Sequence, residues 1–137
     1  MGALAVAAVS FALTSAAFGN GGAIPARYTC AGRDVSPPLA WTAPPPGTRV
    51  LRLRVVDVDA HGFVHWDARA IPASWRGLAA GAHAPVELAN TFEKKGWSGP
   101  CPPQGGGRHR YVFTLTALAA NGRVLARARL VGTFARP

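Results

Sequence analysis

"RVLRLRVVDVD", residues 49–59, decides the fold, because apolar and basic side chains alternate along it. Leu51, Leu53 and Val55 fall on one side of an extended chain, and the arginines between them fall on the other. This period of two is typical of a β-strand that covers a core with one face and meets solvent with the other. The stretch therefore predicts a strand in a half-exposed sheet.

Two further segments alternate in the same way. In "GFVHWDARAIPA" (62–73), we expect Phe63, His65 and Asp67 on one face of a second strand, opposite Trp66. "RYVFTLTALAA" (110–120) predicts a third strand, because threonines alternate there with larger apolar side chains.

The remaining segments are less regular. "VSFALTSAAF" (9–18) suits a buried strand, and "RVLARARLVGTF" (123–134) fits one or two helical turns followed by a closing strand. Segments 36–48 and 74–107 are expected to be long loops. Short apolar runs between dense glycine and proline clusters are typical of all-β domains. We therefore expect an all-β fold with a single domain over 11–137.

The N-terminus and the cysteines leave the compartment open. Residues 1–10 are predicted to be a frayed apolar extension or the remnant of an export signal, and no transmembrane segment is expected. The absence of a basic residue before Arg27 slightly favours the cytoplasm, whereas the apolar start and the cysteine pair favour export. Cys30 and Cys101 are spaced unlike a metal or redox motif, and either form one disulfide or remain buried thiols.

The net charge of +9 would suit a nucleic acid or another acidic partner. The arginines, however, are spread from Arg27 to Arg136 without a run of four, and no nucleic-acid motif is present. We interpret the charge as scattered surface arginine and expect no nucleic-acid partner.

Two acids and two histidines suggest a polar site. Asp57 and Asp59 are two of only six acids, and their equal parity places them on one face of the strand. His65 on the next strand can face them, and His109 follows the loop "GPCPPQGGG" (99–107). Nearby carboxylates make an imidazole easier to protonate.

Each of these residues also has a simpler structural explanation, such as a turn cap, a core histidine or a solvated basic patch. Together they favour a pocket. Proline stiffens a loop, and glycine lets exposed N–H groups approach a ligand, so the 99–107 loop would form a rigid rim suited to an oxyanion.

These residues resemble the phosphatidylethanolamine-binding protein (PEBP) family, in its bacterial and archaeal YbhB/YbcL branch, also called Raf-kinase-inhibitor-like proteins. The resemblance rests on "DVDAH" (57–61), "VHW" (64–66), "GPCPPQGGGRHRY" (99–111), "IPARYTCAGRDVSPPLAW" (24–41) and "ARLVGTF" (128–134). It covers nearly the whole chain from Phe11.

The resemblance implies a larger central antiparallel sheet packed with a smaller second sheet, and few short helices. It also implies a pocket for phosphate-like groups, such as a phospholipid headgroup, and for some members a kinase or protease partner. By motif position the ligand-binding residues would be Asp57, Asp59, His65, Gly99, Pro102, Pro103 and His109. Because both cysteines lie in family-like contexts, the resemblance also favours a Cys30–Cys101 disulfide.

The chain departs from the family pattern at three places. Val58 and His61 replace two prolines of the first motif, so that His61 could add a polar group, and the loop before "FVHW" is shortened. The segment between Leu118 and Val124 is also short, where relatives have a longer segment at the ligand mouth. This short segment predicts a more open site that is less selective for a lipid tail.

The expected function is therefore a non-enzymatic binding module for a small anionic ligand. The alternatives are a small hydrolase using an Asp/His pair and a pure protein-interaction inhibitor. Because no GxSxG motif or metal-ligand spacing is present, we expect no catalytic residue, metal or cofactor.

Overall fold

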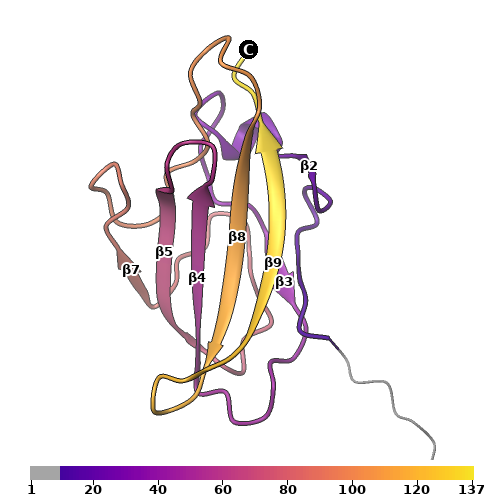
Figure 1. The fold of residues 1–137 in the computed structure, drawn as a ribbon, viewed down its shortest axis with the longest axis vertical. Helices are drawn as coiled ribbons and strands as arrows, with labels where there is room; N and C mark the ends of the chain where they lie inside the picture. The colour runs from indigo at the N-terminus through magenta and orange to yellow at the C-terminus, as the bar shows by residue number, and fades with distance from the viewer. Residues whose placement is uncertain (1–9) are drawn as a thin grey trace, which may run out of the picture.

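The computed structural model describes residues 10–137, which form two β-sheets and one short 3-10 helix (Figure 1). The larger sheet has the strand order β2-β9-β8-β4-β5-β7, and the smaller has the order β1-β3-β6. The elements are β1 (Leu13–Thr14), β2 (Gly22–Ala23), η1 (Ala26–Tyr28), β3 (Leu39–Trp41), β4 (Val50–Asp57), β5 (Phe63–Pro72), β6 (Gly77–Leu78), β7 (Val86–Leu88), β8 (His109–Leu118) and β9 (Val124–Phe134).

The expected all-β class, with a larger and a smaller sheet, is confirmed. All strand pairs in both sheets are antiparallel except β2 with β9. Residues 1–9 of the expected N-terminal extension lie outside the described residues. Among residues 10–137, no helix is long and apolar enough to cross a membrane.

β4 forms the centre of the larger sheet. Its side chains are alternately buried and half-buried from Val50 to Asp57, as the alternation predicts. It pairs with β5 on one side and β8 on the other, and burial alternates along β8 in the same way, with every second residue buried. The sheet therefore has an inner face toward the smaller sheet and an outer face that carries arginine and threonine.

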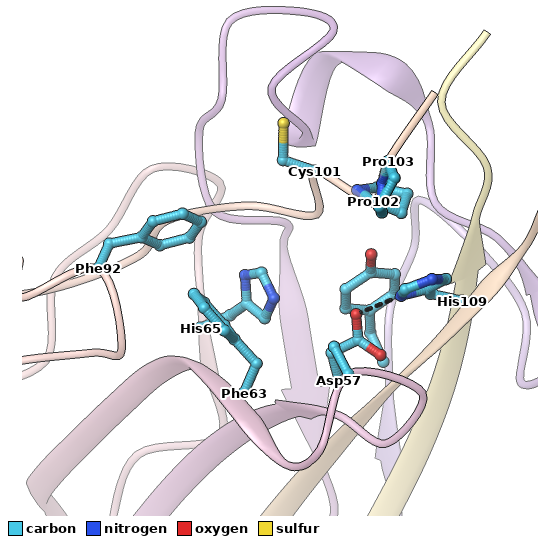
Figure 2. A pocket seen from close by; sticks show the side chains of 10 residues that line it. Asp57, Phe63, His65, Phe92, Cys101, Pro102, Pro103 and His109 are labelled. Carbon is cyan, nitrogen blue, oxygen red and sulfur yellow. Dashed lines mark hydrogen bonds and ion pairs between the residues drawn. The ribbon is translucent and has the colours of Figure 1, made fainter. Parts of the chain in front are cut away.

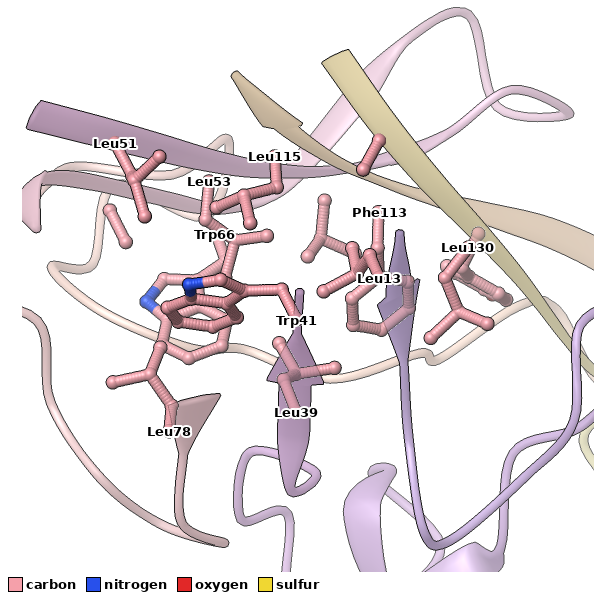
Figure 3. Packing of buried hydrophobic residues seen from close by; sticks show 14 of the residues in the cluster. Leu13, Leu39, Trp41, Leu51, Leu53, Trp66, Leu78, Phe113, Leu115 and Leu130 are labelled. Atoms are coloured by element: carbon pink, nitrogen blue, oxygen red, sulfur yellow. The ribbon is translucent and has the colours of Figure 1, made fainter. Parts of the chain in front are cut away.

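The core lies between the two sheets (Figure 3). Leu53 and Leu115 of the larger sheet are fully buried, and Trp41 and Leu39 of the smaller sheet lie below them. Trp41 Nε1 donates to the Trp75 carbonyl at 2.7 Å, so the indole N–H is satisfied inside the core. Each fully buried side chain of this size contributes about 1.5–3 kcal/mol.

The expected helical turns in 123–134 are wrong, because β9 runs as a strand from Val124 to Phe134. β9 pairs with β8 along its length, from Leu118–Val124 to His109–Phe134. Alanine, leucine and arginine favour a helix locally, but the long ladder with β8 outweighs that preference.

The two expected long loops are also wrong in part. Segment 36–48 contains β3, and segment 74–107 contains β6 and β7. Of the expected strand 9–18, the structure describes residues 10–18, and among these only Leu13–Thr14 is a strand, although Phe18 is buried. Strands of two or three residues are too short to show an alternation in sequence, so tertiary pairing alone defines them.

A β-bulge corrects the expected faces of β5. Val55 pairs with Trp66 but Val56 pairs with Val64, so His65 is the extra residue. A bulge places two successive side chains on one side of the sheet. His65 and Trp66 are therefore both buried on the inner side, and Asp67 lies opposite Arg54 on the outer face rather than beside His65.

Cys30 and Cys101 form a disulfide with a Cα–Cα distance of 5.4 Å. The bond joins the segment after η1 to the 99–107 loop, and the Cys30 N–H donates to the Pro100 carbonyl at 3.1 Å. The disulfide thus attaches the proline-rich loop to a distant part of the chain.

Candidate functional site

A pocket of about 140 Å³ opens where β4 ends and β8 begins (Figure 2). We call it the histidine pocket. It is lined by Asp57, Ala60, Phe63, His65, Phe92, Cys101, Pro102, Pro103, His109 and Tyr111. Five of the seven expected ligand-binding residues are among them, so residues that are far apart in sequence meet here as expected.

Asp57 and His109 form the polar side of the pocket. His109 Nδ1 lies 2.7 Å from Asp57 Oδ2, and the Asp57 side chain is only 4% exposed. The other carboxylate oxygen of Asp57 accepts the Asp59 N–H at 2.8 Å. Since Nδ1 faces the carboxylate, the aspartate orients the ring and leaves Nε2 of His109 available to a ligand.

His65 is held by the backbone of the neighbouring loop. Its Nδ1 lies 2.6 Å from the Ser98 carbonyl, which can only accept, so Nδ1 carries the proton. Burial lowers the pKa of His65 and outweighs the opposing influence of the Ser98 carbonyl and Asp57. The expectation that the carboxylates would favour a protonated imidazole is therefore wrong for His65, whose Nε2 is an acceptor near neutral pH.

Tyr111 is a pocket residue that the sequence reasoning missed. Its hydroxyl is buried and makes no hydrogen bond of good geometry among the described residues, although the Asp57 carboxylate is near enough to interact with it. Burial, together with the charge of Asp57, raises the pKa of Tyr111 above its ordinary value, so the hydroxyl remains a donor. A signal was available, because Tyr111 follows His109 by two residues and therefore shares its face of β8.

The opposite wall of the pocket is apolar. Phe63 and Phe92 meet edge to face with ring centroids 4.7 Å apart, and the Phe63 ring lies 4.9 Å from that of His65. Pro102 and Pro103 cover the pocket from the 99–107 loop (Figure 2). Apolar walls exclude water and strengthen any charge interaction inside the pocket.

Two expected polar contributors, Asp59 and His61, lie outside the pocket. Asp59 instead binds Arg110 through two side-chain hydrogen bonds, and these bonds lower the pKa of Asp59 to about 2. His61 is exposed in the turn after β4 and does not line the pocket. The expected shared face of Asp57 and Asp59 fails because β4 ends at Asp57 and the chain turns there.

Gly99 has a structural place beside the pocket. Its N–H donates to Asp34 Oδ1 at 2.8 Å, and a Cβ at this position would collide with Asp34 and with the Tyr28 carbonyl. Gly99 thus allows the loop to pass close to the segment that carries Cys30.

The short segment between Leu118 and Val124 does not border this pocket. β8 begins at His109 in the pocket and reaches Leu118 at the other end of the sheet. Nine residue steps along a strand span about 30 Å. The expectation that a shortened segment opens the ligand mouth is therefore wrong, because that segment lies at the far end of the molecule.

The family model described as "Phosphatidylethanolamine-binding protein" matches residues 14–135. The chain belongs to this family. A UPF0098 protein of Aquifex aeolicus (strain VF5) is 35% identical over 148 residues, covering 89% of this chain and 86% of the relative. The expected family and the observed fold thus agree.

Two solved PEBP structures have the same fold. The Escherichia coli protein YbcL, described as a member of the mammalian PEBP family, has a TM-score of 0.87 at 25% identity, covering 94% of this chain and all of that one (100%). The PEBP homologue CT736 of Chlamydia trachomatis has a TM-score of 0.85 at 31% identity, covering 93% of this chain and 99% of that one. PEBP membership supports a module of the binding type.

Proposed function

We propose that this PEBP-family protein is a non-enzymatic module that binds a small phosphate-like anion in the histidine pocket. The anion would be a phospholipid headgroup or a phosphorylated small molecule. The observation that carries the proposal is the buried hydroxyl of Tyr111, which makes no hydrogen bond of good geometry among the described residues, beside the oriented ring of His109. A buried donor without a partner costs about 1–3 kcal/mol, and an oxyanion would remove that cost.

The polar groups of the pocket favour an oxyanion that still carries a proton. Tyr111 donates, His109 Nε2 donates when its ring is protonated, and neutral His65 accepts through Nε2. A phosphate monoanion offers unprotonated oxygens to the donors and one P–OH group to His65. A fully deprotonated anion would leave the His65 nitrogen facing negative charge.

The size of the pocket favours a headgroup without its tail. About 140 Å³ is well below the roughly 300 Å³ at which pockets for drug-sized ligands begin. Asp57 already accepts from His109 and from the Asp59 N–H, which suits a positioning role rather than the activation of a water molecule. These contacts support binding over the alternative of hydrolysis.

Titration of the whole chain with phosphate and with phosphoethanolamine, followed by NMR and calorimetry, tests the proposal. We expect Tyr111→Phe to weaken binding about 10-fold, because it removes one hydrogen bond to a charged ligand. We expect His109→Ala to abolish saturable binding. His61→Ala is the matched control, because this exposed histidine lies outside the pocket.

Three other outcomes would reject the proposal. Absence of shifts at millimolar ligand, or equal loss in the His61→Ala control, would rule out the pocket as the site. Turnover of phosphoesters that is lost in His109→Ala would support a hydrolase instead. A protein partner that binds equally well to His109→Ala and Tyr111→Phe, without anion binding by the wild type, would support a protein-interaction inhibitor.

A further inference from the structure

The outer face of the larger sheet contains a second hollow, of about 250 Å³, which shares no lining residue with the histidine pocket. Arg52 and Arg54 of β4 line one side and Arg127 of β9 lines the other. Thr114 and Thr116 of β8 lie between them. We call it the arginine hollow.

Strand register arranges the polar side chains of this face in two rows. Thr116 pairs with Arg52 on one side and with Arg127 on the other. Thr114 pairs in the same way with Arg54 and Arg129. Each row thus reads Arg–Thr–Arg across three strands. Paired residues share a face, and rows two residues apart are separated by about 7 Å.

The arginines of the first side lack hydrogen-bond partners. Asp67 accepts two hydrogen bonds from Arg69, at 3.0 and 3.2 Å. Arg52 Nε and Arg54 Nε lie 3.9 and 4.0 Å from the same carboxylate, beyond hydrogen-bonding distance. Both Nε atoms are buried and have no partner among residues 10–137. The two side chains are 34% and 41% exposed and line the hollow, so their terminal guanidinium N–H groups are the donors that a ligand oxygen can reach.

Positive charge on this face exceeds negative charge. Five arginines (52, 54, 69, 127 and 129) share this face with Asp67, a formal excess of four positive charges, and three of them (52, 54 and 69) lie within 4.0 Å of its carboxylate. Burial, followed by the charge of Arg69, lowers the pKa of Arg52. Within the described chain, Arg127 and Arg129 make no ion pair. The arginines are scattered in the sequence but gather here in space, which corrects the interpretation of the charge as scattered.

We propose that the arginine hollow binds an anion that carries two or three linked phosphoryl groups. Guanidinium groups pair with phosphoryl oxygens in a planar fork, and a threonine hydroxyl can donate to the same groups. A single phosphate would engage one row and leave the other unpaired. A chain of phosphoryl groups reaches both rows, which fits the two Arg–Thr–Arg rows and their charge.

The hollow suits a small oligophosphate better than a nucleic acid strand. No aromatic side chain lines it, so it offers no surface on which bases could stack. Leu118 and Val124 form an apolar end, where the organic part of a nucleoside diphosphate could rest. Inorganic tripolyphosphate and a nucleoside diphosphate present the same kind of phosphoryl groups. Comparison of their affinities therefore shows whether the ligand is an inorganic oligophosphate or a nucleotide.

The test is titration of the whole chain with inorganic tripolyphosphate, followed by calorimetry and by amide shifts in NMR spectra. We expect saturable binding with shifts centred on Thr114, Thr116 and Arg127, and at least 10-fold weaker binding of orthophosphate at these amides. Arg54→Gln and Arg127→Gln should each weaken tripolyphosphate binding about 10-fold. Arg33→Gln is the matched control, because it removes the same charge from an exposed loop. Tighter binding of ADP than of tripolyphosphate would assign the source as a nucleotide.

Several results would overturn this proposal. Equal weakening by Arg33→Gln would reduce the effect to net charge. Loss of tripolyphosphate binding in His109→Ala would place the ligand in the histidine pocket instead. Tighter binding to single-stranded DNA or to anionic phosphatidylglycerol vesicles would assign the face to a macromolecular surface. Because His109→Ala affects only the histidine pocket, the two proposals can fail separately.

Discussion

Opposing influences act on the pKa of His65. The Ser98 carbonyl and Asp57 favour the charged ring, and burial disfavours it. Burial is the largest cause, so the ring is neutral in the folded protein over a range in which it is charged when unfolded. Asp59 differs, because Arg110 stabilises its charge on the surface. Polar residues of two neighbouring motifs thus have different roles.

The lowered pKa of His65 predicts loss of stability in acid. The unfolded chain takes up a proton near pH 6.5, whereas the folded chain resists it, so the unfolded state binds more protons below that pH. The free energy of unfolding should therefore fall as the pH drops below about 6.5 and level off below the folded pKa.

Urea denaturation between pH 7.5 and pH 5 measures this effect. His65→Gln should flatten the dependence, although its stability at pH 7.5 will be lower. His61→Gln is the matched control, because it removes an exposed histidine that makes no ion pair within residues 10–137. A steeper or unaltered slope in His65→Gln would contradict the assignment.

At the scale of elements, the bulge in β5 and the register of β8 position the side chains of the histidine pocket. The bulge turns His65 inward beside Trp66, and the pairing of β8 with β4 sets Asp57 opposite Tyr111. Asp67, which the simple alternation puts with His65, lies beside Arg52 and Arg54 on the outer face instead. One extra residue in one strand thus separates the two proposed sites.

The closing strand offers a test of packing between elements. Gly132 of β9 lies beside β2, and a Cβ there would lie 2.5 Å from Ile24 Cγ1 and 2.8 Å from Phe18 Cε2. We expect Gly132→Ala to destabilise the protein by about 1–3 kcal/mol through overpacking. Gly19→Ala, where a Cβ meets nothing within 4 Å, should change the stability by less than about 1 kcal/mol. Thermal denaturation of both variants measures the difference, and equal melting temperatures of the two would contradict the packing argument.

At the scale of the whole molecule, the disulfide connects the core scaffold to the pocket. It joins residues 71 positions apart, and Cys101 itself lines the histidine pocket next to Pro102. Closure of so long a loop restricts the unfolded chain, and the same bond holds the proline-rich rim in place. Stability and ligand affinity are therefore linked through one covalent bond.

Removal of the disulfide should affect both properties. The double variant Cys30→Ser with Cys101→Ser should lose about 2–5 kcal/mol of unfolding free energy. Its affinity for phosphate should also fall, because ordering the free 99–107 loop would oppose binding. Denaturation and calorimetry measure the two effects, and unchanged affinity in a folded variant would show that the rim is rigid without the bond.

The sequence by itself determined the strand core and most of the histidine pocket. Alternation is a local property, so β4 and β8 could be predicted, and five pocket residues followed from motif positions. Strand β9 was missed in its first half because its local preference is helical and its partner is remote.

Only the tertiary structure decided which polar groups meet. Whether Asp59 faces the pocket or Arg110, and whether Tyr111 has a partner, depends on a turn and on packing from distant segments. The Arg–Thr–Arg rows likewise arise from register across three strands. Hydrogen bonds and burial act over a few ångströms in space, and spacing along the chain does not specify those distances.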